Sequence, residues 1–188
     1  SSVSIDLAAG SGANGYGGTD SFTDVENVTG SNYADILLGD GNANTLNGGD
    51  SDDLLNGRGG NNVLIGGNGV DTAQFSDATG PVSANLQTSS ASNGFGGTDT
   101  LLTIENLVGS DFNDPLQGDA NANRLDGGAG DDVLTGRGGD DVYLVESIGD
   151  SVIETSGEGT DEIRTALSIY ALPAHVETLT YTGAGAFI

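Results

Sequence analysis

The glycine pattern of this chain repeats every nine residues over two long stretches. From Gly30 the phase holds for five units, "GSNYADILL", "GDGNANTLN", "GGDSDDLLN", "GRGGNNVLI" and "GGNGVDTAQ". A second run starts at Gly109 with "GSDFNDPLQ", "GDANANRLD", "GGAGDDVLT" and "GRGGDDVYL". The sixth residue of every unit is Asp or Asn, and the eighth is Leu, Tyr or, once, Ala73. So regular a phase predicts stacked structural repeats, because a disordered linker has no reason to keep it.

Each unit combines a turn with a short strand. Six glycine-rich residues tolerate the positive φ angles of a tight turn, and the next three place one apolar side chain inward. Two units close one coil, and stacked coils pair their strands in parallel. We therefore predict an all-β fold around a thin buried column of eighth-position side chains, namely Leu37, Leu46, Leu55, Leu64, Leu116, Leu125, Leu134 and Tyr143.

The net charge opposes such a fold unless cations neutralise it. Asp and Glu number 28 against 4 Lys and Arg, a formal net charge of −24. A column this thin cannot offset the lost chain entropy alone, so we expect bound cations to complete the fold. This charge disfavours nucleic acid and anionic membrane surfaces as partners. No run has the length of a membrane span or the form of a signal peptide, so we expect no membrane insertion. The absence of cysteine excludes disulfides.

A longer period encloses the period of nine. Residues 15–20, "GYGGTD", match residues 94–99, "GFGGTD", and residues 25–31, "VENVTGS", match residues 104–110, "IENLVGS", at an offset of 79. We predict two tandem copies of a 79-residue module. The expected boundaries are a lead-in of strands and loops at 1–29, a first array at 30–74, a second lead-in at 75–108, a second array at 109–145, and a β-rich flank at 146–188. The flank contains the strand-like runs "SVIE", "DEIRTALSIYAL" and "VETLTYT", and its apolar ending suggests a piece of a longer protein.

Sixth positions two units apart should face each other, because alternate turns lie on the same side of a two-strand coil. Hard divalent cations take six or more oxygen ligands, so a pair of facing turns makes one site. Since two carboxylates hold a divalent ion better than two amides, we rank the pairs by charge. The ranking places Asp35/Asp53, Asp53/Asp71 and Asp114/Asp132 first, Asp132/Asp150 and Asn123/Asp141 second, and Glu26/Asn44, Asn44/Asn62 and Glu105/Asn123 last.

The units resemble the calcium-binding nonapeptide G-G-x-G-x-D-x-U-x of the RTX, or haemolysin-type, family. The resemblance implies a right-handed parallel β-roll, type I secretion, and folding in the calcium-rich exterior. It also implies carbonyl ligands from the second and fourth residues of the earlier turn and the first and third of the later turn. In this sequence those residues are Ser31, Tyr33, Gly48 and Asp50; Gly49, Ser51, Gly66 and Asn68; Ser110, Phe112, Gly127 and Ala129; and Gly136 and Gly138.

Other residues offer little chemistry. His175 is the only histidine, and a structural role is expected for it. The chain has no Cys nucleophile and no G-x-S-x-G elbow, so we expect a non-catalytic protein. Asp114-Pro115 is interpreted as a coordinating Asp followed by a tolerated edge proline; the alternative is the Asp-Pro bond that some RTX proteins cut themselves.

Four side chains have specific expected contacts. Arg58 and Arg137 occupy equivalent turn positions, where they could pair with carboxylates. Tyr16 and Phe95 lie on matching glycine loops, where they cover a column end or stack on a sugar.

The sequence thus predicts a calcium-binding, calcium-dependent folding module of a secreted or cell-surface bacterial protein such as an adhesin, toxin or exoenzyme. The alternative is a polysaccharide-binding module attached to a carbohydrate-active enzyme such as an alginate epimerase. A basic or aromatic stripe would favour the second, and four arginines without lysine argue against one. The expected partners are calcium ions and, through the parent protein, a polysaccharide or cell-surface ligand.

Overall fold

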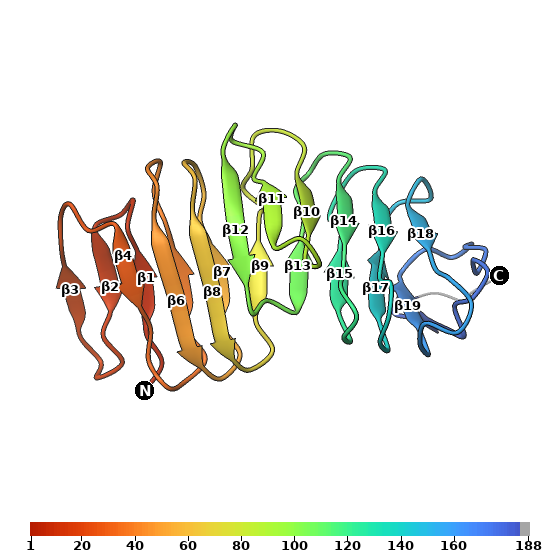
Figure 1. The fold of residues 1–188 in the computed structure, drawn as a ribbon, viewed down its shortest axis with the longest axis horizontal. Helices are drawn as coiled ribbons and strands as arrows, with labels where there is room; N and C mark the ends of the chain where they lie inside the picture. The colour runs from red at the N-terminus through yellow and green to blue at the C-terminus, as the bar shows by residue number, and fades with distance from the viewer. Residues whose placement is uncertain (185–188) are drawn as a thin grey trace.

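The computed structural model describes residues 1–184, which form an elongated solenoid of two stacked sheets (Figure 1). The described residues form twenty strands and no helix. Since every element is a strand, this part of the chain also has no helix that could cross a membrane. The all-β prediction is confirmed.

The first sheet has eleven strands in the order β20-β19-β17-β15-β13-β9-β7-β5-β1-β2-β3. Their bounds are β1 Ser4–Asp6, β2 Ser11–Ala13, β3 Thr19–Ser21, β5 Ile36–Leu38, β7 Leu54–Asn56, β9 Thr72–Gln74, β13 Asn106–Val108, β15 Arg124–Asp126, β17 Val142–Val145, β19 Glu162–Thr165 and β20 Thr178–Tyr181.

The second sheet has nine strands in the order β18-β16-β14-β10-β11-β12-β8-β6-β4. Their bounds are β4 Asn27–Thr29, β6 Thr45–Asp50, β8 Val63–Asn68, β10 Ser83–Asn85, β11 Ser90–Ser92, β12 Thr98–Leu102, β14 Pro115–Gln117, β16 Val133–Thr135 and β18 Ser151–Ile153.

Alternate nonapeptides pair in parallel, as the period predicts. In one sheet Leu37 is the register partner of Leu55, and in the other Leu46 is the partner of Leu64. The eighth-position side chains point between the sheets, and all eight predicted members of the column are 0 % exposed. The repeat therefore forms its strands with residues seven to nine, and the parallel β-roll is confirmed.

The two lead-ins each contain antiparallel hairpins that the sequence did not predict. Strands β1, β2 and β3 pair antiparallel in sequence, and so do β10, β11 and β12. Strands β10 and β11 lie 79 residues after β1 and β2 in the chain. Strand β12 then pairs in parallel with β8, and β13 pairs with β9, so the roll continues without a gap from the first array into the second.

Pro115 begins β14 and costs the sheet one hydrogen bond. The equivalent Ile36 donates its N–H to the carbonyl of Val3 at 3.0 Å. Proline has no N–H to donate, and the pairing of β10 with β14 starts one residue later, at Ala84 and Leu116. The proline is tolerated at the first residue of a strand, where such losses are smallest.

The flank continues the roll through strands β18, β19 and β20, one in each strand-like run. His175 lies before β20, is exposed, and has a left-handed backbone with φ of 68°. The last four residues of the run "TYTGAGAFI" lie outside the described residues.

Candidate functional site

The sixth-position side chains form ladders along the roll. The N–H of Asp35 donates to Asp53 Oδ1 at 2.8 Å, and the N–H of Asp53 donates to Asp71 Oδ1 at 2.8 Å. The ladder continues to Glu105, whose Oε2 accepts from the N–H of Asp71 at 2.8 Å. On the opposite side, Asn44 donates in the same way to Asn62 Oδ1 at 2.9 Å. The prediction that turns two units apart face each other is confirmed.

The second array has the same two ladders. Asp114 donates its N–H to Asp132 Oδ1 at 2.8 Å, and Asp132 donates to Asp150 Oδ1 at 3.1 Å. Asn123 donates to Asp141 Oδ1 at 2.7 Å on the other side. In each case one oxygen of the sixth-position side chain is used by the fold, because the N–H at position six would otherwise be buried without an acceptor.

The second residue of a turn decides what the other oxygen of a sixth-position aspartate contacts. Ser31 and Ser110 each donate their N–H to Oδ2 of the aspartate four residues later. The four other aspartate turns of the arrays lack this bond, and their second residues have a positive φ; these residues are Gly49, Gly67, Gly128 and Arg137, with φ of 115°, 117°, 86° and 81°. The aspartates of these four turns, Asp53, Asp71, Asp132 and Asp141, each have a buried Oδ2 without a hydrogen-bond partner.

These four oxygens are the observation that calls for a ligand. A buried carboxylate oxygen without a donor loses its hydration and gains nothing in return. The same turns contain the glycine pair or glycine-arginine pair that begins a nonapeptide. A hard cation bound beside each of these turns would satisfy its oxygen, which the hydrogen-bond donors of this chain do not.

The space beside each orphaned oxygen is kept open by the first glycine of the turn. A Cβ on Gly48 would overlap Asp53 Oδ2, and a Cβ on Gly127 would overlap Asp132 Oδ2. In the turn at Gly109, a Cβ would lie 2.5 Å from both Asp114 Oδ2 and the carbonyl oxygen of Gly127. The side chain of the earlier turn and the first carbonyl of the later turn therefore face one small oxygen-lined space.

Burial and mutual repulsion both favour the protonated form of these carboxylates. Burial raises the pKa of Asp71 and of Asp132 to about 6, and the neighbouring carboxylates contribute to the increase. Burial likewise raises the pKa of Asp141 to about 7, with Asp161 as the strongest like charge. A bound divalent cation reverses this balance, because opposite charge stabilises the ionised form.

The structure places several predicted carbonyl ligands in the gap between turns. The carbonyl oxygens of Ser31, Ser51, Ser110 and Phe112 each face a glycine of the turn two units later. The first-residue carbonyls of Gly48, Gly127 and Gly136 face the glycine that begins the earlier turn. The carbonyl of Gly49 faces Gly67.

The carbonyls of Tyr33, Asp50, Gly66, Asn68, Ala129 and Gly138 stay predicted ligands. The carbonyl of Tyr33 accepts a hydrogen bond from Ser31 Oγ at 3.4 Å. The side chain of Asp50 accepts one from Asn68 Nδ2 at 2.8 Å.

A cluster at the end of the second array was not predicted as a unit. Ligand oxygens of Asp141, Glu154 and Asp161 lie within 4.8 Å of one another. Tyr143 OH contacts Glu154 Oε1, and both face Gly136 beside the orphaned Oδ2 of Asp141. Sequence reasoning missed Glu154 and Asp161 because Asp161 follows Asp141 by 20 residues, which breaks the ninefold phase. The available signal was Ile163, an apolar residue two after the acid.

Asp99 is a second missed member of a ladder. Its Oδ1 accepts from the N–H of Asn62 at 2.9 Å, and its Oδ2 is buried without a partner. Burial raises the pKa of Asp99 to about 6. Residues 94–102, "GFGGTDTLL", have glycine first, aspartate sixth and leucine eighth, so the nonapeptide pattern could have found this turn inside the lead-in.

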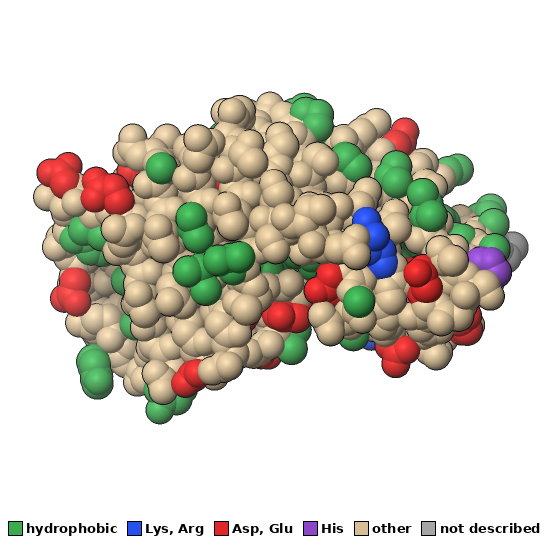
Figure 2. Space-filling model, in the orientation of Figure 1, with side chains coloured by type: hydrophobic (Ala, Val, Ile, Leu, Met, Phe, Trp, Pro, Cys, Tyr) green, Lys and Arg blue, Asp and Glu red, His purple; other side chains and the backbone are tan. Residues whose placement is uncertain are grey.

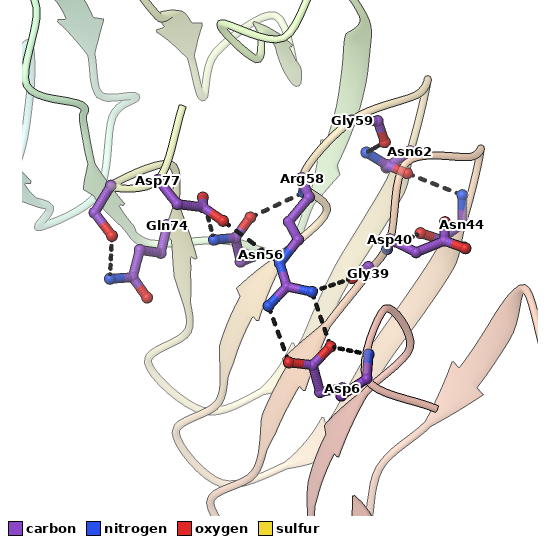
Figure 3. A network of polar contacts seen from close by, with 12 residues as sticks. Asp6, Gly39, Asp40, Asn44, Asn56, Arg58, Gly59, Asn62, Gln74 and Asp77 are labelled. Carbon is purple, nitrogen blue, oxygen red and sulfur yellow. Dashed lines mark hydrogen bonds and ion pairs between the residues drawn. The ribbon is translucent and has the colours of Figure 1, made fainter. Parts of the chain in front are cut away.

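Arg58 anchors a polar network on one side of the first array (Figure 3). Its guanidinium donates to both carboxylate oxygens of Asp6, at 2.8 and 3.0 Å, and to the carbonyl of Gly39 at 2.9 Å. Asp77 lies 3.4 Å from Nε of the same guanidinium. The predicted pairing of Arg58 is confirmed. For Arg137 it is wrong, because this side chain reaches the Gln117 amide oxygen at 3.1 Å.

The surface is acidic and has few exposed basic groups. Figure 2 shows one face, on which acidic side chains are scattered and the blue basic atoms gather in one small area. Tyr16 is 92 % exposed, so the expectation that it covers a column end is wrong. Its counterpart Phe95 is half-buried and packs against the core.

The comparisons agree with this geometry. The model of the RTX calcium-binding nonapeptide repeat matches the chain four times, at residues 20–54, 29–64, 38–73 and 108–143. A search of curated proteins finds no relative. The matched segments cover nearly all of both arrays and contain the four array aspartates whose Oδ2 has no partner. Residues 20–73 and 108–143 therefore consist of RTX calcium-binding nonapeptide repeats, and the described chain folds as a parallel β-roll.

Proposed function

We propose that this chain is a non-catalytic module that folds when it binds calcium, in a bacterial protein that is secreted by a type I apparatus. The calcium-binding character follows from the RTX repeats. Secretion and the nature of the parent, whether adhesin, toxin or exoenzyme, are the proposed part. The buried Oδ2 atoms of Asp53, Asp71, Asp132 and Asp141 carry the proposal, since nothing in the described chain satisfies them.

The residues that would hold the ions are those that line the gaps between stacked turns. Carboxylates come from the sixth positions, with Asp35, Asp53 and Asp71 in the first array and Asp114, Asp132 and Asp150 in the second. Carbonyls come from the glycine-rich residues that precede them. At the end of the roll, Asp141, Asp161 and Glu154 supply three carboxylates to one gap. Bound calcium would supply positive charge where the chain has concentrated its own negative charge.

The energetic consequence is that folding and binding become one process. At free calcium tenfold above a site's dissociation constant, that site stabilises the folded state by about 1.4 kcal/mol. Extracellular modules have dissociation constants of about 0.1 to 1 mM, so the calcium of the exterior suffices and that of the cytoplasm does not. The chain would therefore stay unfolded during export and fold outside the cell.

The test is a calcium titration followed by far-ultraviolet circular dichroism. We expect a disordered spectrum in chelator, a cooperative change to a β spectrum between about 0.1 and 10 mM Ca²⁺, and no such change with Mg²⁺, which demands a tighter octahedral shell. A β spectrum that is unchanged by excess chelator would contradict the proposal. Export is tested separately, by fusing the chain with its parent's C-terminal region and assaying the culture medium.

A further inference from the structure

The N-terminal end of the roll has two unpaired sheet edges. Strand β3 is the last strand of one sheet and β4 is the last strand of the other (Figure 1). At the junction between the arrays, the equivalent strands of the second copy are paired: β12 with β8, and β13 with β9. We propose that the N-terminal end is a docking surface for one further copy of the chain's own 79-residue module, joined through the chain as the first copy is joined to the second.

The junction inside the chain shows which contacts such a copy would make. Asp99 Oδ1 accepts from the N–H of Asn62 at 2.9 Å, and Glu105 Oε2 accepts from the N–H of Asp71 at 2.8 Å. Both acceptors thus continue the ladders of the first array into the second copy. Their sequence counterparts are Asp20 and Glu26.

These counterparts have no partner at the N-terminal end. Asp20 and Glu26 are exposed, and within residues 1–184 their carboxylates accept no hydrogen bond. The apolar residues at the N-terminal end are likewise more exposed than their counterparts at the junction. Leu101 is 2 % exposed and Leu107 is 0 % exposed, whereas their counterparts Phe22 and Val28 are only half-buried. The N-terminal end therefore has the same kinds of acceptors and apolar residues as the junction, but without the junction's partners.

The backbone of the end already has the docked conformation. Asn93 Oδ1 accepts from two N–H groups of its own loop at 3.2 and 3.0 Å, and Asn14 Oδ1 does the same at 3.1 Å for both. Thr103 has φ of 50°, and the counterpart Asp24 has φ of 55°. A surface that adopts its bound form without the partner loses little conformational entropy on docking.

Gly18, at the N-terminal end, is the counterpart of a glycine that the junction requires for close backbone packing. At the junction, a Cβ on Gly97 would overlap the carbonyl oxygen of Gly60, which belongs to the first copy. The counterpart Gly18 lies near only Asn14 of its own loop. The glycine at position 18 thus matches the junction geometry and is not required by any backbone approach that the N-terminal end makes itself.

Two observations indicate that the docked copy is linked through the chain. They are the connection between the first and second copies and the structure of the C-terminal end of the roll. Residues 75–82 join the first copy to the second, and Val82 corresponds to Val3, so the same connection would lead into β1. The opposite end of the roll also has two sheet edges, but one of them, β20, belongs to the flank. Strand β18, the equivalent of β9, ends its sheet, but β17, the equivalent of β8, already pairs with β19 of the flank. Repeat rolls are extended by further repeats and closed by atypical ones, and the flank is the atypical part.

The decisive experiment adds the missing copy to the chain. A protein made of residues 1–79 followed by the full chain of residues 1–188 is compared with the 188-residue chain by amide hydrogen exchange in saturating calcium. We expect exchange at Thr19–Ser21 and Asn27–Thr29 of the original copy to slow by roughly tenfold or more, toward the rates at Thr98–Thr100 and Asn106–Val108. Unchanged exchange at these residues would overturn the proposal, as would a separate unfolding transition for the added copy.

A pair of variants keeps the test independent of how well the longer chain folds. In the 188-residue chain, Asp99→Ala should lower the melting temperature and Asp20→Ala should leave it unchanged. In the longer chain, Asp20→Ala of the original copy should lower the melting temperature as Asp99→Ala does. No effect of Asp20→Ala in the longer chain would overturn the proposal. So would a dimer of the 188-residue chain in analytical ultracentrifugation that Asp20→Ala dissociates, because the occupant would then be a second chain.

Discussion

The backbone N–H of Asp35 donates to Oδ1 of Asp53, 18 residues further along the chain, at 2.8 Å. This single bond couples one turn to the turn stacked on it and fixes the carboxylate of Asp53 in a buried place. The second oxygen of that carboxylate has no partner. One side chain thereby serves both the fold and the proposed calcium site, and the two roles can be separated by mutation.

Asp53→Asn should weaken calcium binding while keeping the bond to Asp35, because an amide retains an acceptor oxygen but loses the charge. We expect the calcium concentration at the midpoint of folding to rise, and Asp53→Ala to raise it further, since a buried N–H without an acceptor costs about 1 to 3 kcal/mol. The measurement is a calcium titration by circular dichroism. The control is Asp52→Asn, an exposed residue of the same turn that keeps its hydrogen bond to the N–H of Val70. Equal calcium midpoints for Asp52→Asn and Asp53→Asn would contradict the role of Asp53 in calcium binding.

Acid should favour the folded state when calcium is absent. Burial raises the pKa of Asp71 and Asp132 to about 6 and that of Asp141 to about 7, from an ordinary value of 3.8. The folded state therefore binds more protons than the unfolded state between pH 3.8 and about 7, and its stability falls as the pH rises through this window. In chelator we expect β structure to increase as the pH is lowered from 7 toward 4. With saturating calcium the circular dichroism spectrum should stay constant over the same pH range. A metal-free chain that gains β structure as the pH rises would contradict the prediction.

Leu37→Ala should destabilise the roll far more than Ile36→Ala in the same strand. Leu37 is 0 % exposed in the column, whereas Ile36 is 44 % exposed on the outside of β5. Removing a buried leucine side chain costs about 2 to 5 kcal/mol, and a surface substitution stays within about 0.5 kcal/mol. Urea unfolding in saturating calcium measures both. Similar losses for the two variants would mean that the column is not the main apolar core.

Gly109→Ala should raise the calcium midpoint, because its Cβ would enter the space between Asp114 Oδ2 and the carbonyl of Gly127, 2.5 Å from each. Gly41→Ala is the matched control, since no atom lies within 4 Å of a Cβ built there. Neither glycine has a positive φ, so backbone strain does not separate the two variants. A calcium midpoint that moves equally in both variants would show that the space beside Gly109 is not used.

Much of the fold and of the candidate site could be predicted because the repeat is local and strict. The spacing of the eighth-position side chains, from Leu37 to Tyr143, predicts the column, and the two-unit spacing of Asp53 and Asp71 predicts the ladder. Both follow from a coil of fixed length. Prediction failed where the phase is broken. The hairpins of the lead-ins, and the longer step from Asp141 to Asp161, depend on pairings that no local period encodes.

The sequence by itself determined the period, the eighth-position column and the residues that face one another, because a coil of two nine-residue units leaves no freedom in register. Only the tertiary structure decided which carboxylate oxygens remain without a partner. That outcome depends on the backbone of the second turn residue, where Ser31 donates its N–H to Asp35 and the left-handed Gly49 leaves Asp53 Oδ2 free. It also decided that β12 and β13 close onto the first array while β3 and β4 stay open, since edge pairing depends on what lies beside a strand and not on the strand's own residues.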